Sequence, residues 1–167
     1  MTASRRPVLV RLAALATVPL ALVAVALPAA AERVVGTAGD DVLRGTAEAD
    51  TMRGRGGDDL LRGRGGDDDI RAGGGSDVVL AGPGDDYVQD NKGNDRVATA
   101  GGSDLVDLSA GRDEVITGGG ADRVHVYPDG RRDVIDCGAG RDEVFYSHGV
   151  DRRDVLRGCE LVRATAD

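Results

Sequence analysis

A nine-residue period runs through the chain from Gly36 to His125 and constrains the fold more than any other feature. Cut at Gly36, this segment divides into ten consecutive blocks, of which GRGGDDLLR and GRGGDDDIR are the most regular. The eighth place is aliphatic or methionine in every block, and the fourth is glycine in nine. The sixth place is always aspartate: Asp41, Asp50, Asp59, Asp68, Asp77, Asp86, Asp95, Asp104, Asp113 and Asp122. Ten matches in phase indicate a solenoid, in which one short unit stacks on its neighbours.

Each block predicts one turn followed by one short strand. Places one to four are rich in glycine, which reaches backbone conformations closed to other residues, so this half is expected to turn. Places seven to nine, as in Val42–Arg44, Leu60–Arg62 and Val78–Leu80, predict a strand whose middle residue points inward. Two blocks then make one coil with strands on opposite sides. Blocks stack odd on odd and even on even, about 4.8 Å apart.

The block pattern resembles the hemolysin-type, or RTX, calcium-binding repeats, whose consensus is G-G-x-G-x-D-x-U-x. The resemblance covers Gly36 to His125 continuously, and more loosely the stretch to about Val144. It implies an all-β fold, a parallel β-roll, built from nine-residue turn-strand units and binding calcium.

The composition indicates that hydrophobic burial alone does not order this chain. Its 167 residues include 26 glycines, three tyrosines, one phenylalanine and no tryptophan, too few large apolar side chains for an ordinary core. The formal net charge is −8, and Lys92 is the one lysine, which argues against nucleic-acid binding. We therefore expect the repeats to be largely disordered without a cation and to fold as it binds.

Stacking the blocks predicts two ladders of aspartates, one along each edge of the roll. Like charges about 5 Å apart repel by about 1–3 kcal/mol at an effective dielectric constant of 20–80, and a divalent cation between successive turns reverses this. Calcium fits because it takes six to eight oxygens, whereas magnesium demands tighter octahedral geometry and zinc prefers Cys and His. The predicted ligands are the ten aspartates and turn glycines, whose carbonyls are free to bind: Gly54, Gly56, Gly63, Gly65 and Gly74.

Two observations leave an alternative open for part of the ladder. An aspartate in a glycine-rich turn can simply cap its own backbone, which would explain one or two of these residues but not ten in phase. Glu48 replaces the fourth-place glycine of the second block. Four later blocks replace the first glycine, with Asp90, Thr99, Leu108 and Thr117. Stacking without an ion stays open for these turns.

Residues 1–31 predict a signal peptide. The segment is basic through Arg5, Arg6 and Arg11, apolar over Leu12–Leu27, and ends in the A-x-A site Ala29–Ala31. An uncleaved membrane anchor is the alternative, and export by the general or the twin-arginine route stays open. We expect a secreted, extracellular protein in a compartment where calcium is plentiful and disulfides persist.

The chain is expected to divide into the signal peptide, calcium-binding repeats over residues 32–125, and degenerate repeats with a C-terminal cap over 126–167. Cys137 and Cys159 are the only cysteines, and in an exported chain they predict a disulfide that closes the cap. A metal or redox pair is the alternative, but the C-x-x-C spacing is missing.

The function we favour is a secreted calcium-binding β-roll, free or acting in adhesion or scaffolding. Its partners are calcium ions, with no nucleic acid, no membrane after signal cleavage, and an unknown cell-surface or protein partner. Several strand residues that should point outward are apolar, and they indicate either a docking patch for another surface or a lateral contact within the cap or with a second copy of the chain: Val78, Leu80, Leu105 and Ile116.

Two other functions are weighed against it. A secreted β-solenoid enzyme acting on an acidic polysaccharide could use calcium with Arg96, Arg123 and Arg141. The sequence lacks H-E-x-x-H, G-x-S-x-G and P-loop motifs, and neither His125 nor His148 belongs to a catalytic constellation. A cation-independent glycine-rich surface or ice-binding solenoid would be favoured by a regular threonine ladder, which Thr37, Thr46, Thr51, Thr99 and Thr117 do not form.

Overall fold

The computed structural model describes residues 30–165, and all regular elements in this range are strands. The predicted signal peptide lies outside this range except for Ala30 and Ala31. Within residues 30–165 there is no helix long and apolar enough to cross a membrane.

The strands are short and follow the repeat period. They are β1 (Arg33–Val35), β2 (Val42–Arg44), β3 (Thr51–Gly56), β4 (Leu60–Arg62), β5 (Asp69–Gly74), β6 (Val78–Pro83), β7 (Tyr87–Lys92), β8 (Arg96–Gly101), β9 (Leu105–Leu108), β10 (Glu114–Ile116), β11 (Gly119–Gly120), β12 (Arg123–Val126), β13 (Val134–Asp136), β14 (Ala139–Gly140), β15 (Glu143–Tyr146), β16 (Val155–Arg157) and β17 (Leu161–Ala164).

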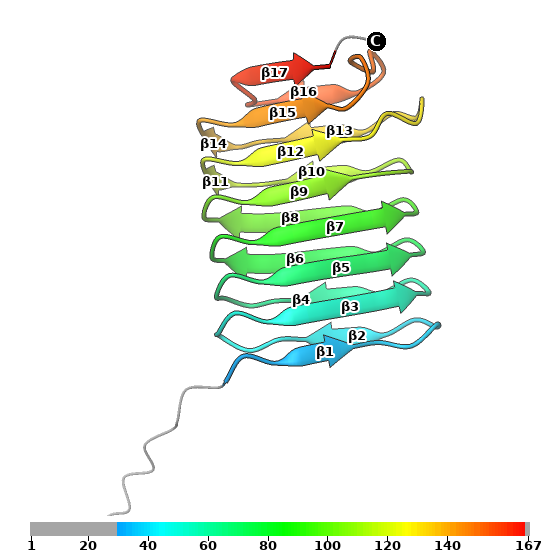
Figure 1. The fold of residues 1–167 in the computed structure, drawn as a ribbon, viewed down its shortest axis with the longest axis vertical. Coiled ribbons are helices and arrows are strands. Elements are labelled where there is room, and N and C mark those ends of the chain that lie inside the picture. Colours follow the sequence, from blue (N-terminus) through cyan, green and yellow to red (C-terminus); the bar gives the residue numbers. More distant parts are fainter. Residues whose placement is uncertain (1–29, 166–167) are drawn as a thin grey trace, which may run out of the picture.

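The strands form two parallel sheets that face each other along the length of a roll (Figure 1). One sheet has the order β1-β3-β5-β7-β9-β12-β15-β17, and the other runs β16-β13-β10-β8-β6-β4-β2, with β11 and β14 beside it. Leu43 pairs with Leu61 and Leu61 with Val79, a step of two blocks. Met52 pairs with Ile70 in the other sheet at the same step. The predicted parallel β-roll, with odd blocks on odd and even on even, is confirmed.

The core is a thin double column between the sheets. The eighth-place residues of all ten blocks are buried, and those of β3 to β7 are completely enclosed. The first place of the blocks also points inward, which the sequence did not predict: Ala72, Ala81, Asp90, Thr99, Leu108 and Thr117 are fully buried. Each coil therefore buries only a few side chains, as the composition indicated.

The turns are shorter than the sequence predicted. In β3, β5, β6, β7 and β8 the strand continues through places one to three of the next block, giving six residues instead of three. Parallel pairing extends there, for example between Arg55 and Gly73. A residue with positive φ at place two lets the backbone bend while it stays paired, and Arg55 (φ 86°) and Arg64 (φ 89°) adopt this conformation without being glycine.

The roll continues past residue 125 to the end of the described chain. The step between paired strands widens from 18 to 20 residues, so that Val124 pairs with Val144 and Val115 with Ile135. The last pairs are β13 with β16 and β15 with β17. The predicted disulfide is confirmed: Cys137 and Cys159 are bonded, with their Cα atoms 5.2 Å apart, beside the final coil.

Candidate metal centre

The sixth-place aspartates form two continuous ladders, one at each edge of the roll. In each ladder Oδ1 of one aspartate accepts a hydrogen bond from the backbone N–H of the aspartate one coil earlier. Asp59 N–H donates to Asp77 Oδ1 at 2.8 Å, and Asp68 N–H donates to Asp86 Oδ1 at 2.9 Å. These bonds hold successive coils in register along both edges.

The ladders extend beyond the ten predicted residues. The first runs from Asp113 through Asp133 to Asp154, with N···O distances of 3.0 and 2.9 Å. The second runs from Asp122 to Asp142 and ends at Glu160, with distances of 2.9 and 2.8 Å. The return of Asp142 nine residues after Asp133 was the signal in the sequence for these additional rungs.

In most rungs the other carboxylate oxygen has no hydrogen-bond partner. The exceptions are the first rung of each ladder, where Oδ2 caps its own turn by accepting from Thr37 N–H (Asp41) or Thr46 N–H (Asp50), and Asp154, whose Oδ2 accepts from the Tyr146 hydroxyl. Oδ2 is buried and accepts no hydrogen bond from the described part of the chain in the following rungs: Asp59, Asp68, Asp77, Asp86, Asp95, Asp104, Asp113, Asp122 and Asp142. A buried, unpaired carboxylate oxygen is costly unless a cation or a proton compensates it. In these rungs the two oxygens of one carboxylate therefore differ: the chain supplies a hydrogen-bond donor to Oδ1 and none to Oδ2.

The first-place glycines border the Oδ2 atoms, which are unpaired in Asp59 and Asp68 and accept a threonine N–H in Asp41 and Asp50. A Cβ on Gly36 would lie 2.7 Å from Asp41 Oδ2 and 2.6 Å from the Gly54 carbonyl oxygen of the next coil. The same two kinds of oxygen crowd Gly45, Gly54 and Gly63. A side chain at these places would fill a space lined by a carboxylate and a backbone carbonyl, which are the ligand types that calcium prefers.

The third-place glycines differ. A Cβ on Gly56 or Gly65 would meet no atom closer than 3.5 Å or 3.6 Å, respectively, and one on Gly74 would meet nothing within 4 Å. Glycine is not required there by space, so only a role of the carbonyl oxygen would make these three residues ligands. Among the predicted glycines, Gly54 and Gly63 are the ones placed against a ladder carboxylate.

The electrostatics of the ladders favour a bound cation. Burial, opposed by the backbone N–H donor and reinforced by neighbouring aspartates, raises the pKa of Asp68 to about 6 and that of Asp86 to about 7. The same causes raise the pKa of Asp95 to about 7 and shift Asp59 and Asp77 in the same direction. Each ladder thus holds carboxylates whose charge the protein leaves uncompensated.

A second, outer set of side chains adds hydrogen bonds but no buried oxygen. Asp40 Oδ1, at place five, accepts from Asp58 N–H at 2.8 Å, and Asp67 Oδ1 accepts from Asp85 N–H at 2.8 Å. These side chains are exposed, so their charge is hydrated. They stabilise the turn without contributing to the enclosed ladder.

The arginines proposed for an enzymatic alternative do not converge. Arg96 lies on β8 and pairs with Glu114 at 3.2 Å, while Arg123 lies on β12 of the opposite sheet and pairs with Glu143 at 3.5 Å. His125 lies 3.6 Å from Asp107 and packs against Phe145. Arg123 and His125 line one hollow on their sheet together with Asp107 and Glu143, whereas Arg96 lies on the opposite sheet.

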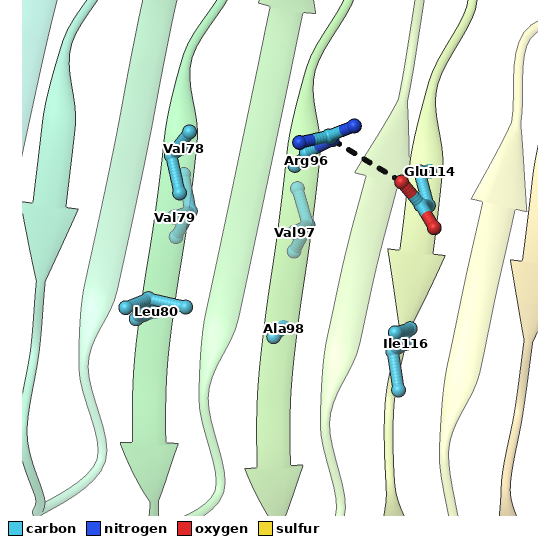
Figure 2. A pocket seen from close by; sticks show the side chains of 8 residues that line it. All are labelled: Val78, Val79, Leu80, Arg96, Val97, Ala98, Glu114 and Ile116. Carbon is cyan, nitrogen blue, oxygen red and sulfur yellow. Dashed lines mark ion pairs between the residues drawn. The ribbon is translucent and has the colours of Figure 1, made fainter.

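The predicted apolar patch is divided between the two sheets. Figure 2 shows the side chains that line a pocket on the outer face of β6, β8 and β10. Leu80, Ala98 and Ile116 lie in a row across the three strands, on the C-terminal side of the Arg96–Glu114 ion pair. Val78 belongs to the same face, whereas Leu105 lies on β9 of the other sheet. Leu105 therefore does not contribute to this pocket, since alternate blocks belong to opposite faces.

Comparison with known families gives one match. The matching family is the RTX calcium-binding nonapeptide repeat, which matches the sequence in four copies, at residues 35–70, 44–79, 71–106 and 100–126. Together these copies span residues 35–126, more than half of the chain. Among curated proteins, none matches the sequence.

Proposed function

The chain belongs to the RTX calcium-binding nonapeptide repeat family, and from this we propose that it is a secreted protein whose β-roll folds as calcium ions bind between successive Gly/Asp turns. Calcium binding is the property of these repeats, and the buried aspartate ladder fits it. The coupling to folding, the individual ligands and the secretion are our proposals.

The observation that carries the proposal is the row of buried, unpartnered Oδ2 atoms along both edges. If the carboxylates are ionised and no cation is present, like charges are enclosed one above another with no compensating side chain in the row. A calcium ion between two rungs reverses this repulsion and draws the coils together. Folding and binding should therefore occur together.

The proposed side-chain ligands are the ten sixth-place aspartates, and carbonyl oxygens of the glycine turns complete the coordination. Gly54 and Gly63 are supported by their position against Asp59 and Asp68. Gly56, Gly65 and Gly74 are proposed from their place in the repeat. When bound, calcium supplies only charge neutralisation and cross-linking, and the chain supplies the spacing of the oxygens.

The proposed location is extracellular, with residues 1–31 as signal peptide, 32–125 as calcium-binding repeats, and 126–167 as degenerate repeats and cap. The Cys137–Cys159 disulfide supports an oxidising compartment. We favour adhesion or scaffolding over catalysis because Arg96 and Arg123 lie on opposite sheets and are each paired with a glutamate.

The test is a calcium titration of the purified protein, followed by far-UV circular dichroism and isothermal titration calorimetry. We expect a largely disordered spectrum in excess chelator and a β-rich spectrum on adding calcium, with several ions bound per chain. Magnesium at the same concentration serves as the control and should not restore the spectrum. An unchanged β-rich spectrum in chelator, with no heat of calcium binding, would refute the proposal.

A further inference from the structure

Asp90 is an inward-facing carboxylate at a place where the other blocks have none. It occupies the first place of its block, which on the same edge is Gly36, Gly54, Ala72 and Leu108. Asp90 is completely buried, in a column between Ala72 below and Leu108 above, both also fully buried. An acidic side chain in an apolar column requires a compensating partner.

The chain satisfies only one oxygen of this carboxylate. Asp90 Oδ1 accepts a hydrogen bond from the backbone N–H of Ser109 at 2.9 Å. Asp90 Oδ2 is buried and accepts no hydrogen bond from residues 30–165. The side chain therefore directs an unpaired oxygen into the interior.

The Asp90 carboxylate belongs to a cluster with two ladder rungs. One carboxylate oxygen each of Asp90, Asp95 and Asp113 lie within 4.8 Å of one another, and all three residues are buried. Asp95 Oδ2 and Asp113 Oδ2 are also unpaired. Burial first, and then the charges of Asp113 and Asp95, raise the pKa of Asp90 to about 8, because no basic side chain offsets them.

We propose that Asp90 completes a three-carboxylate calcium site with Asp95 and Asp113, and that this site binds calcium more tightly than the other turns of the roll. The inference rests on the proposed function, because Asp95 and Asp113 are ladder ligands, and adds a side-chain ligand from a place that the repeat normally reserves for glycine. A third anionic oxygen at this distance strengthens the attraction for a divalent ion. The turn between the blocks that begin at residues 90 and 108 is then the first to fill.

The test is calcium binding measured by competition with a chromophoric chelator, comparing wild type with Asp90→Ala and Asp90→Asn. Alanine is the natural residue at the same place one coil earlier, Ala72, so it fits the space. Asp90→Ala is expected to weaken the tightest site at least about tenfold, leaving the weaker sites in place. Asp90→Asn keeps an oxygen acceptor for Ser109 N–H and should give a smaller loss in the same site.

Leu108→Ala is the matched control. It lies at the same place on the next coil and costs packing without removing a ligand, so it should weaken the tightest site clearly less than Asp90→Ala does. Unchanged tightest affinity in Asp90→Ala and Asp90→Asn, with wild type binding calcium, would overturn the Asp90 site and leave the proposed function standing. A loss as large in Leu108→Ala would also overturn it, because the effect would then come from packing and not from a lost ligand. A wild-type chain that binds no calcium would overturn the proposed function itself.

Discussion

Replacing Gly63 by alanine places a methyl group where two oxygens already meet. Its Cβ would lie 2.5 Å from the Ala81 carbonyl oxygen and closer still to Asp68 Oδ2. The Ala81 carbonyl is held by Arg64 N–H at 2.8 Å, and Asp68 Oδ1 is held by Asp50 N–H at 2.8 Å, so neither oxygen can move freely. Overpacking of this kind costs about 1–3 kcal/mol, and we expect the lower part of that range because Ala81 already carries a buried methyl group at the same place one coil later.

Gly65→Ala, two residues away in the same block, is the control. Its Cβ would meet nothing closer than the Pro83 carbonyl oxygen at 3.6 Å, so the free energy of unfolding should change by less than about 0.5 kcal/mol.

The assay is urea unfolding at saturating calcium, together with a calcium titration of each variant. Gly63→Ala should lower the unfolding midpoint and weaken calcium binding, because the methyl group displaces the carboxylate oxygen that faces the ion. Equal midpoints for Gly63→Ala and Gly65→Ala would refute the argument that the first-place space is needed.

Three further predictions concern the carboxylates, the core and the disulfide. In calcium-free buffer the folded roll should gain stability as the pH falls from about 7 to about 4. In that window Asp86, Asp95 and Asp133, whose pKa burial raises to about 7, hold protons when folded and lose them when unfolded. Three such protons give a slope of up to about 4 kcal/mol per pH unit, so the chain that is largely disordered in chelator at pH 7 should gain β structure on acidification, and a circular dichroism spectrum that stays disordered down to pH 4 would contradict this. Leu61→Ala, in the fully buried column, should cost about 2–5 kcal/mol in urea unfolding, whereas Val42→Ala, 61 % exposed, should cost less than about 0.5. Cys137→Ser with Cys159→Ser should lower stability by about 3 kcal/mol, and hydrogen exchange should locate the loss at β13, β16 and β17; uniform loss along the roll would contradict a local closure.

The repeat period was sufficient to predict the roll, its two rows and its inward column. Side chains alternate along a strand, and place eight is apolar in every block, so its direction follows from the sequence. The step of 18 residues between Leu43 and Leu61 follows from two blocks per coil. The disulfide was predictable because only two cysteines are present.

The inward direction of place one was not predicted, because glycine has no side chain to reveal it. The signal was present only in later blocks, where Ala72, Thr99 and Leu108 are small or apolar. Thr99 and Thr117 are buried, and their hydroxyls donate to the carbonyl oxygens of Thr117 and Cys137 at 3.0 and 2.9 Å. They are interior hydrogen-bonding groups and contribute nothing to a surface threonine array.

The hydrogen bond made by Oδ1 does not by itself explain why the sixth place is aspartate in all ten blocks. At place five the equivalent bond between coils is made by Asp40 to Asp58 N–H, and elsewhere by Asn94 to Arg112 N–H at 3.0 Å, so an amide oxygen serves equally well there. An asparagine at place six could make the same bond, yet none of the ten blocks has one. The difference between the two places is burial: the second oxygen is hydrated at place five and enclosed at place six. An enclosed amide nitrogen in place of Oδ2 would turn N–H donors toward a bound cation and would offer it no ligand oxygen. In the eight blocks from Asp59 to Asp122 the requirement for aspartate therefore comes from the enclosed, unpaired Oδ2, the oxygen that we propose for calcium, whereas in Asp41 and Asp50 this oxygen caps the turn.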